Sequence, residues 1–143
     1  MGIIHKVGKY IKSSILNLEY EEIVITRQVI ESIMDMAKQA HPKEFIILLK
    51  GDVHNNKLVI SSLVYQSYQA SENSSVMMMN LPLMSGVRGS CHSHPSYSNS
   101  PSSEDLKFFN KHPGLHLIIC RPYGISNMAS YDTYGKNIHF RII

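Results

Sequence analysis

The spacing of apolar side chains along the chain predicts two helices. Between residues 26 and 40, apolar positions recur with the period of an amphipathic helix; these positions are Val29, Ile30, Ile33, Met34, Met36, Ala37 and Ala40. Thr26 is a suitable N-cap for this helix. The helix is expected to end at His41, because the following Pro42 disfavours helical geometry in the residue before it. A second, shorter helix is predicted over residues 102–110.

Short apolar runs predict strands in most of the remaining chain. Residues 44–51 form a nearly unbroken apolar run, which suits a strand buried on both faces. Residues 52–56 predict a turn, and residues 58–65 predict a second strand that pairs with the first as a hairpin. The methionine-rich region 66–86 gives no clear pattern, and its methionines are interpreted as core residues rather than metal ligands. Further strands are expected at 22–25, 87–94, 115–120, 125–131 and 137–142.

The order of these elements predicts an α+β layer fold rather than a doubly wound one. The strands occur in runs instead of alternating regularly with helices. At 143 residues, the chain has the size of one domain. We therefore expect a single domain over residues 1–143, in which residues 1–21 form an N-terminal segment.

Composition narrows the functional classes mainly by exclusion. Apolar residues make up 43% of the chain and charged residues 17%, a balance typical of globular rather than disordered proteins. No apolar run approaches the ~20 residues of a transmembrane helix, and the N-terminus lacks the features of a secretory signal, so a cytoplasmic protein is expected. Lys and Arg exceed Asp and Glu by 14 to 11. These basic residues are scattered, whereas a nucleic-acid-binding surface normally shows a basic stripe.

The segment 92–105 carries the candidate chemistry. Side chains alternate across a strand, so His92 and His94 project to the same face, one pleat apart. After an intervening loop, Asp105 lies one turn into the predicted second helix and can turn its carboxylate back toward the histidines. Two imidazoles and one carboxylate suit Zn²⁺ and leave a fourth position for water, which is typical of a catalytic zinc site. Glu44, at the start of its apolar strand, is the candidate base for that water.

Each part of this pattern also has an ordinary structural interpretation. Ser102 and Asp105 have the spacing of a helix N-cap and its first-turn acid, and a bare His-x-His can be two strand histidines. Nucleophilic Ser-His-Asp catalysis would leave the second histidine and Glu44 without roles. A zinc deaminase needs H-x-E and a downstream P-C-x-x-C. Here a histidine stands where that glutamate should be, and there is no C-x-x-C.

The remaining candidate residues receive structural interpretations. Cys91 should face away from His92, and both Cys91 and Cys120 are interpreted as reduced, mostly buried thiols. Residues 97–99 lie in the loop that would rim a metal, where contact with substrate and ordinary loop composition both explain them. The other histidines are expected on the surface or in turns: His5, His41, His54, His112, His116 and His139.

Together these residues resemble the JAMM (MPN-plus) metalloprotease motif. The motif here consists of Glu44, then His92-Ser93-His94, seven residues, Ser102, two residues and Asp105. The resemblance implies a cytidine-deaminase-like/MPN layer architecture, with a mixed, curved sheet of about six strands flanked by two main helices. It also implies one Zn²⁺ per chain, held by His92, His94 and Asp105. Glu44 resembles the general acid/base, and Ser102 resembles the hydroxyl that helps to hold the developing oxyanion.

The same resemblance implies a zinc-dependent metalloprotease or isopeptidase that hydrolyses peptide or isopeptide bonds. Because the chain leaves little room for ubiquitin-binding insertions, it looks like the compact prokaryotic or archaeal members, with ubiquitin-like or small sulfur-carrier-like proteins as substrates. A small peptide or amide is an alternative substrate. Two further alternatives are a nucleic-acid-associated protein like the RadC-type domains, which the scattered basic charge disfavours, and a non-catalytic MPN scaffold, which the complete motif disfavours. No membrane partner is expected, and an oligomer stays open.

Overall fold

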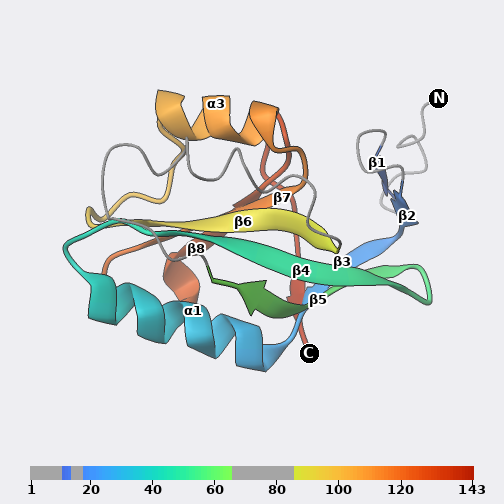
Figure 1. The fold of residues 1–143 in the computed structure, drawn as a ribbon, viewed down its shortest axis with the longest axis horizontal. Helices are drawn as coiled ribbons and strands as arrows, with labels where there is room; N and C mark the ends of the chain where they lie inside the picture. Colours follow the sequence, from blue (N-terminus) through green and yellow to red (C-terminus); the bar gives the residue numbers. More distant parts are fainter. Residues whose placement is uncertain (1–10, 14–17, 66–85) are drawn as a thin grey trace.

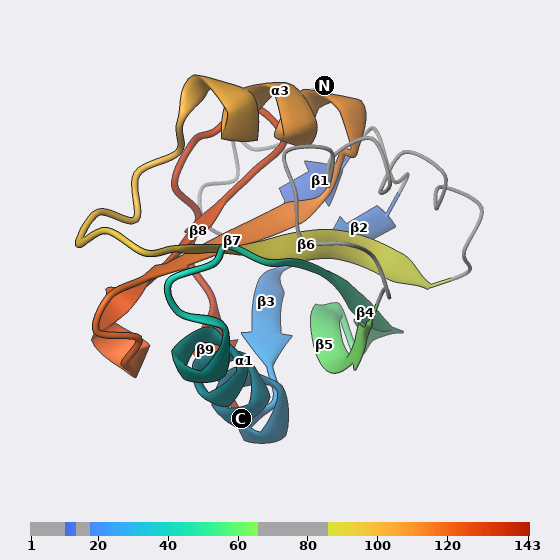
Figure 2. The ribbon, with the colours of Figure 1, turned by 60° about the vertical axis from the view of Figure 1, so that its left-hand side comes forward.

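The structure, a computed structural model, describes residues 11–13, 18–65 and 86–143. A seven-stranded sheet with the order β8-β7-β6-β4-β5-β3-β9 forms its centre (Figure 1). β6 pairs parallel with β7 and antiparallel with β4, so the sheet is mixed, and the strand direction turns strongly between β3 and β6 (Figure 2). These features confirm the predicted α+β fold with a mixed, curved sheet. The strands of this sheet are β3 (Glu22–Ile25), β4 (Ile46–His54), β5 (Lys57–Val64), β6 (Val87–His94), β7 (Leu115–Cys120), β8 (Met128–Tyr131) and β9 (Arg141–Ile142), and a separate two-stranded sheet holds β1 (Ile11–Ser13) and β2 (Leu18–Tyr20).

Two α-helices cover opposite faces of the seven-stranded sheet (Figure 1). α1 (Arg27–Ala40) begins after Thr26, whose Oγ1 accepts a hydrogen bond from the Val29 N–H at 3.3 Å, so the predicted N-cap is confirmed. α3 (Ser103–Lys111) covers the other face, and η2 (Ile125–Asn127) is a single 3-10 turn. In the described part of the chain, no helix combines the length and the apolar character needed to cross a membrane.

The alternation of side chains along β6 and β7 divides the core into two clusters. Cys91 and Leu117 belong to the cluster that packs against α1. Ile118 belongs to the smaller cluster, which includes Phe109 of α3. His92, the residue after Cys91, faces this second cluster, with its ring edge-on to Phe109 at a centroid distance of 5.7 Å. The candidate site therefore lies between the sheet and α3. As predicted, the two cysteines of the chain are free and buried.

Three predicted strands differ from the observed strands in their boundaries. β4 begins at Ile46 rather than at residue 44 and continues to His54, because the hairpin turn needs only Asn55 and Asn56. Both asparagines have positive φ (49° and 65°), which asparagine tolerates better than most residues. The predicted strand 125–131 begins as η2 and becomes β8 only at Met128. Of the predicted strand 137–142, only β9 forms a strand and pairs with β3, while Asn137 makes an isolated bridge to Tyr131. The interpretation of the methionines falls on residues outside the described ranges.

Candidate metal centre

β6 brings His92 and His94 to the α3 face of the sheet. One residue separates them on the strand, so their side chains leave it on the same face. β4 and β7 flank β6, with Ile46 opposite His92 on one side and Ile118 opposite it on the other. The strand that follows Glu44 therefore lies next to the histidine strand. This enclosure leaves His92 only 4% exposed, while His94 is half-buried.

α3 presents Asp105 to these histidines through its own N-terminal cap. The Ser102 Oγ accepts a hydrogen bond from the Asp105 N–H at 3.0 Å, and the Asp105 Oδ2 accepts one from the Ser102 N–H at 2.8 Å. This reciprocal pair is a capping box, so the structural interpretation of the Ser102–Asp105 spacing is correct. The same cap fixes the direction of the carboxylate, because one of its oxygens is held by the first turn of the helix.

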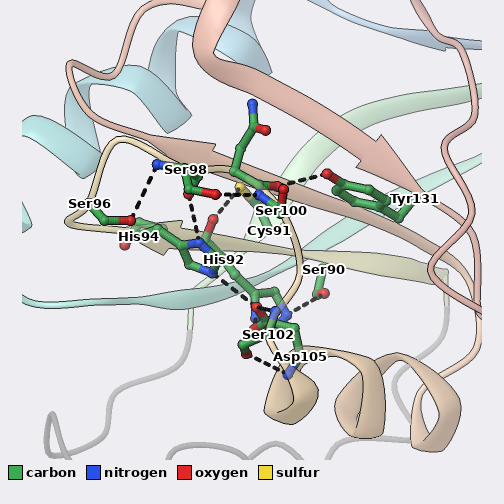
Figure 3. Close-up of polar contacts among 12 residues, drawn as sticks. Ser90, Cys91, His92, His94, Ser96, Ser98, Ser100, Ser102, Asp105 and Tyr131 are labelled. Atoms are coloured by element: carbon green, nitrogen blue, oxygen red, sulfur yellow. Dashed lines mark hydrogen bonds and ion pairs between the residues drawn. The ribbon is translucent and has the colours of Figure 1, made fainter.

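The Asp105 carboxylate contacts both imidazoles (Figure 3). Its Oδ1 lies 3.3 Å from His92 Nδ1, and its Oδ2 lies 3.0 Å from His94 Nε2. Burial acts to raise the pKa of the Asp105 carboxyl, but hydrogen bonds from the two histidines and from the Ser102 N–H outweigh it and hold that pKa far below its usual range. The hydrogen bond with Asp105 in turn raises the pKa of His94. The site therefore keeps an ionised carboxylate against two imidazoles.

The other nitrogen of each ring also has a partner. His92 Nε2 lies 3.0 Å from Ser90 Oγ, and His94 Nδ1 lies 3.0 Å from the backbone carbonyl oxygen of Ser98. Such outer partners fix the orientation and the tautomer of histidines that bind metals. Sequence reasoning missed both. Ser90 lies two residues before His92 and so on the same strand face, a signal that could have identified it, whereas nothing in the sequence marks a backbone carbonyl as a partner.

Glu44 lies near His94 but not on a strand. The sequence predicted Glu44 at the start of a strand, yet Glu44 precedes β4 and is exposed. The next residue sets its place: the Phe45 N–H donates to Ser93 Oγ at 2.8 Å, and the Ser93 N–H donates to the Phe45 carbonyl at 3.1 Å. The pKa of His94 is raised mainly by Asp105, and Glu44 is close enough for its charge to contribute.

The other candidate residues lie around this centre. Ser102 is exposed at the N-terminus of α3. In the loop between β6 and α3, Tyr97 is 73% exposed, and the Arg121 guanidinium lies 4.9 Å from the centroid of its ring. The Tyr131 hydroxyl donates to the Asn99 carbonyl at 2.7 Å (Figure 3), which fastens this loop to β8.

The prediction for the remaining histidines was wrong at His116. This residue is fully buried on β7, where its ring stacks on that of Phe109 at 4.3 Å. The parallel pairing of β6 and β7 sets Ser90 opposite His116, a long-range relation that local spacing does not show. His54 and His139 are exposed, as predicted.

The donor atoms of His92, His94 and Asp105 fit a zinc ion. Zinc binds imidazole nitrogen and carboxylate oxygen at about 2.0–2.2 Å, so two such atoms on a tetrahedral ion lie about 3.4 Å apart. The observed N–O separations, each to a different oxygen of Asp105, are 3.3 and 3.0 Å, which are also hydrogen-bond distances. Within the described ranges, no three or more His, Cys, Asp or Glu side chains surround a common centre as a finished metal cage would.

Comparisons with known proteins point to one family. Residues 26–134 match the family described as prokaryotic homologs of the JAB domain. A Haloferax volcanii protein described as a probable metalloprotease is 26% identical over 128 residues, which cover 81% of this chain and 76% of that protein. A JAB1/MPN domain protein from Archaeoglobus fulgidus has a similar structure, with a TM-score of 0.67 and 33% identity over 83% of this chain and 97% of that one. A structure described as JAMM, a metalloprotease-like zinc site in the proteasome and signalosome, has a TM-score of 0.65 and 31% identity over 85% of this chain and 98% of that one.

Proposed function

Because the chain belongs to the family of prokaryotic homologs of the JAB domain, we propose that it is a zinc-dependent metalloprotease that hydrolyses peptide or isopeptide bonds. The contact of Asp105 with His92 and His94 carries this proposal, since it joins two imidazoles and a carboxylate from two separate elements. Similarity to a probable metalloprotease and to a metalloprotease-like zinc site supports it.

His92, His94 and Asp105 would hold one Zn²⁺. The ion would supply Lewis acidity, which polarises a scissile carbonyl and lowers the pKa of a bound water to about 7. The protein itself would fix the orientation of each ligand side chain toward the ion. Hydrogen-bond partners occupy the outer nitrogens of both rings, and the cap of α3 holds one oxygen of the carboxylate. Such fixed outer partners limit how far the ligand atoms can turn away from the site.

Glu44 and Ser102 would handle the proton and the oxyanion. Glu44 is exposed beside His94, so its carboxylate can take a proton from an attacking water and deliver it to the leaving amine nitrogen. The Ser102 Oγ accepts the Asp105 N–H through a lone pair and so keeps its own proton to donate to the developing oxyanion. One well-placed donor of this kind contributes on the order of 3 kcal/mol to transition-state stabilisation.

Ubiquitin-like or small sulfur-carrier-like proteins are the proposed substrates. His94 is half-buried and both Glu44 and Ser102 are exposed, so the site opens to solvent. An open site of this kind can receive a flexible chain end carried by a folded partner. Similarity to the zinc site described in the proteasome and signalosome supports a protein substrate over a small amide.

Zinc content and cleavage, measured on the purified full chain, test this proposal. Elemental analysis should find about one zinc per chain in the wild type and in Glu44→Gln, and much less in His92→Ala. Cleavage is followed by mass spectrometry on isopeptide-linked di-ubiquitin and on a sulfur-carrier protein with a C-terminal extension. The wild type should cleave at least one of these probes, and Glu44→Gln should cleave neither. Turnover that survives in Glu44→Gln would refute the role of Glu44, and unchanged zinc in His92→Ala would refute the ligand assignment.

A further inference from the structure

A buried chain of hydrogen bonds continues from the candidate metal centre into the core. Ser90 Oγ lies 3.0 Å from His92 Nε2 on one side and 2.6 Å from His116 Nδ1 on the other. Both Ser90 and His116 are 0% exposed. Figure 3 shows the first part of this chain, from Asp105 through His92 to Ser90. Its last member, His116, lies on the neighbouring strand β7. Among the described residues, Asp105 makes its histidine contacts with His92 and His94 and not with His116.

Burying the imidazole of His116 costs folding free energy, which suggests that the ring has a functional role. Its ring stacks on Phe109 at 4.3 Å, and Phe108 approaches it edge-on at 6.1 Å. Within the described residues, His116 Nε2 has no hydrogen-bond partner. Such an unpaired buried atom costs roughly 1–3 kcal/mol. An apolar side chain would fill this aromatic layer without that cost, so packing alone does not account for a histidine here.

The single proton of the Ser90 hydroxyl restricts how the chain can be ordered. If His92 Nδ1 is to offer a lone pair to a metal, the ring proton must lie on Nε2 and donate to Ser90 Oγ. The Ser90 hydroxyl then donates to its other neighbour, His116 Nδ1. In the opposite order, Ser90 donates to His92 Nε2, and the His92 proton lies on Nδ1. The nitrogen that faces Asp105 then carries a proton and cannot bind a metal.

We propose that His116 is a positioning residue that accepts the Ser90 hydroxyl proton at Nδ1 and thereby selects the tautomer of His92 able to bind zinc. This inference rests on the proposed function, because His92 is a ligand of that metal centre. Burial is the main reason that the pKa of His116 is lowered, to about 3, so the ring is neutral near pH 7 and Nδ1 can accept. The proton of the neutral ring then lies on Nε2.

The zinc affinity of the full chain, measured by competition with a chromogenic chelator, tests the role of His116. His116→Leu removes the acceptor and keeps a buried side chain of similar size. It should weaken zinc binding by about tenfold, the lower end of the effect of losing an outer partner of a ligating histidine, because His116 acts on His92 through Ser90. His116→Asn places an amide oxygen near the position of Nδ1 and should restore most of the affinity.

His112→Leu is the matched control. The His112 ring packs against Phe108 at 4.4 Å, in the same aromatic layer as His116, but it makes no contact with Ser90 in the described residues. This variant should therefore bind zinc as the wild type does. Wild-type affinity in His116→Leu would overturn the proposal. An equal loss in His112→Leu, or no recovery in His116→Asn, would also overturn it.

Long-range ¹H–¹⁵N spectra supply a second readout, which a merely structural role would not change. In the zinc-loaded wild type, His116 should be protonated at Nε2 and not at Nδ1; a proton on Nδ1 would overturn the proposal even if no variant folds. In zinc-free protein, where His92 Nδ1 donates to Asp105, the readout is the share of His92 protonated at Nε2. His116→Leu should lower this share, and an unchanged share would count against the proposal. A wild-type chain that binds no zinc would refute the proposed function instead, and the zinc-free spectra would still test the hydrogen-bond chain.

Discussion

Asp105 serves the helix and the candidate metal centre with the same carboxylate. Its Oδ2 accepts the Ser102 N–H and lies against His94, while its Oδ1 lies against His92. The pKa of this carboxyl stays low although burial opposes ionisation, because these hydrogen bonds favour the charged form. A substitution that removes the charge and keeps the shape therefore separates the two roles.

We expect Asp105→Asn to lose most of its zinc and to keep α3. The amide oxygen can still accept the Ser102 N–H, so the free energy of unfolding of the zinc-free protein should fall by about 1 kcal/mol, as for a weakened helix cap. A neutral amide is a poor zinc ligand compared with a carboxylate. Elemental analysis and urea unfolding measure the two effects, with Glu104→Gln, an exposed acid in the same turn, as the control. A full complement of zinc in Asp105→Asn would contradict the ligand assignment.

His116 should make the zinc-free protein sensitive to acid. Burial lowers the pKa of His116 to about 3, whereas a histidine in an unfolded chain titrates near about 6.5. Between these pH values the unfolded chain binds a proton that the folded chain does not, so stability falls as the pH decreases. His116→Leu should remove this contribution, which is about 1 kcal/mol per pH unit. Urea unfolding between pH 7 and 5 measures it, and equal slopes in the two proteins would contradict the burial argument.

At the scale of elements, the loop that carries Glu44 is held at both ends although Glu44 itself is exposed. At one end, His41 Nδ1 lies 2.7 Å from the Tyr123 hydroxyl, where α1 stops. At the other end, the Phe45 N–H is bound to Ser93 Oγ. The general acid/base proposed here therefore depends on contacts between α1, β6 and the turn after β7.

Tyr123→Phe should release one end of this loop. The substitution removes a single hydroxyl, so the free energy of unfolding should fall by about 1 kcal/mol. Because Glu44 loses a fixed support, kcat on a cleaved probe should fall by up to about tenfold while zinc content stays unchanged. Tyr134→Phe, at a position that is 71% exposed, is the control and should leave both quantities unchanged. A full kcat in Tyr123→Phe would show that this contact does not position Glu44.

Elements with local signals were predictable from the sequence, and contacts between distant segments were not. α1 has helical spacing and a cap at Thr26, and β6 has the alternation that places His92 and His94 together. β9 was predicted too long, because its pairing with β3 depends on residues at the other end of the chain. The same limit applies to the site. The motif spacing identified its candidate residues, but the approach of Ser90 to His116 arises only when β6 and β7 pair.

At the scale of the whole molecule, the candidate metal centre joins two layers of the fold. His92 and His94 come from the sheet, and Asp105 comes from α3. α3 otherwise packs on this face mainly through Phe108 and Phe109. In the unfolded chain, the loop and the strand that bring these three side chains together are absent. Zinc should therefore bind the folded chain far more tightly than the unfolded one.

Zinc should accordingly stabilise the whole fold. Substituting a proposed ligand should reduce this stabilisation, whereas substituting the proposed base, Glu44, should not. A ligand that binds only the folded state contributes about 2.7 kcal/mol when its free concentration is 100 times its dissociation constant. Calorimetric melting with and without zinc should show this increase in the wild type and in Glu44→Gln. Glu44 is the proposed acid/base and not one of the proposed zinc ligands, so its substitution should not affect zinc binding. Asp105→Ala should lose the increase, since it removes the contribution of α3. An equal increase in Asp105→Ala would place the stabilising zinc elsewhere on the molecule and would separate the metal from the centre formed by β6 and α3.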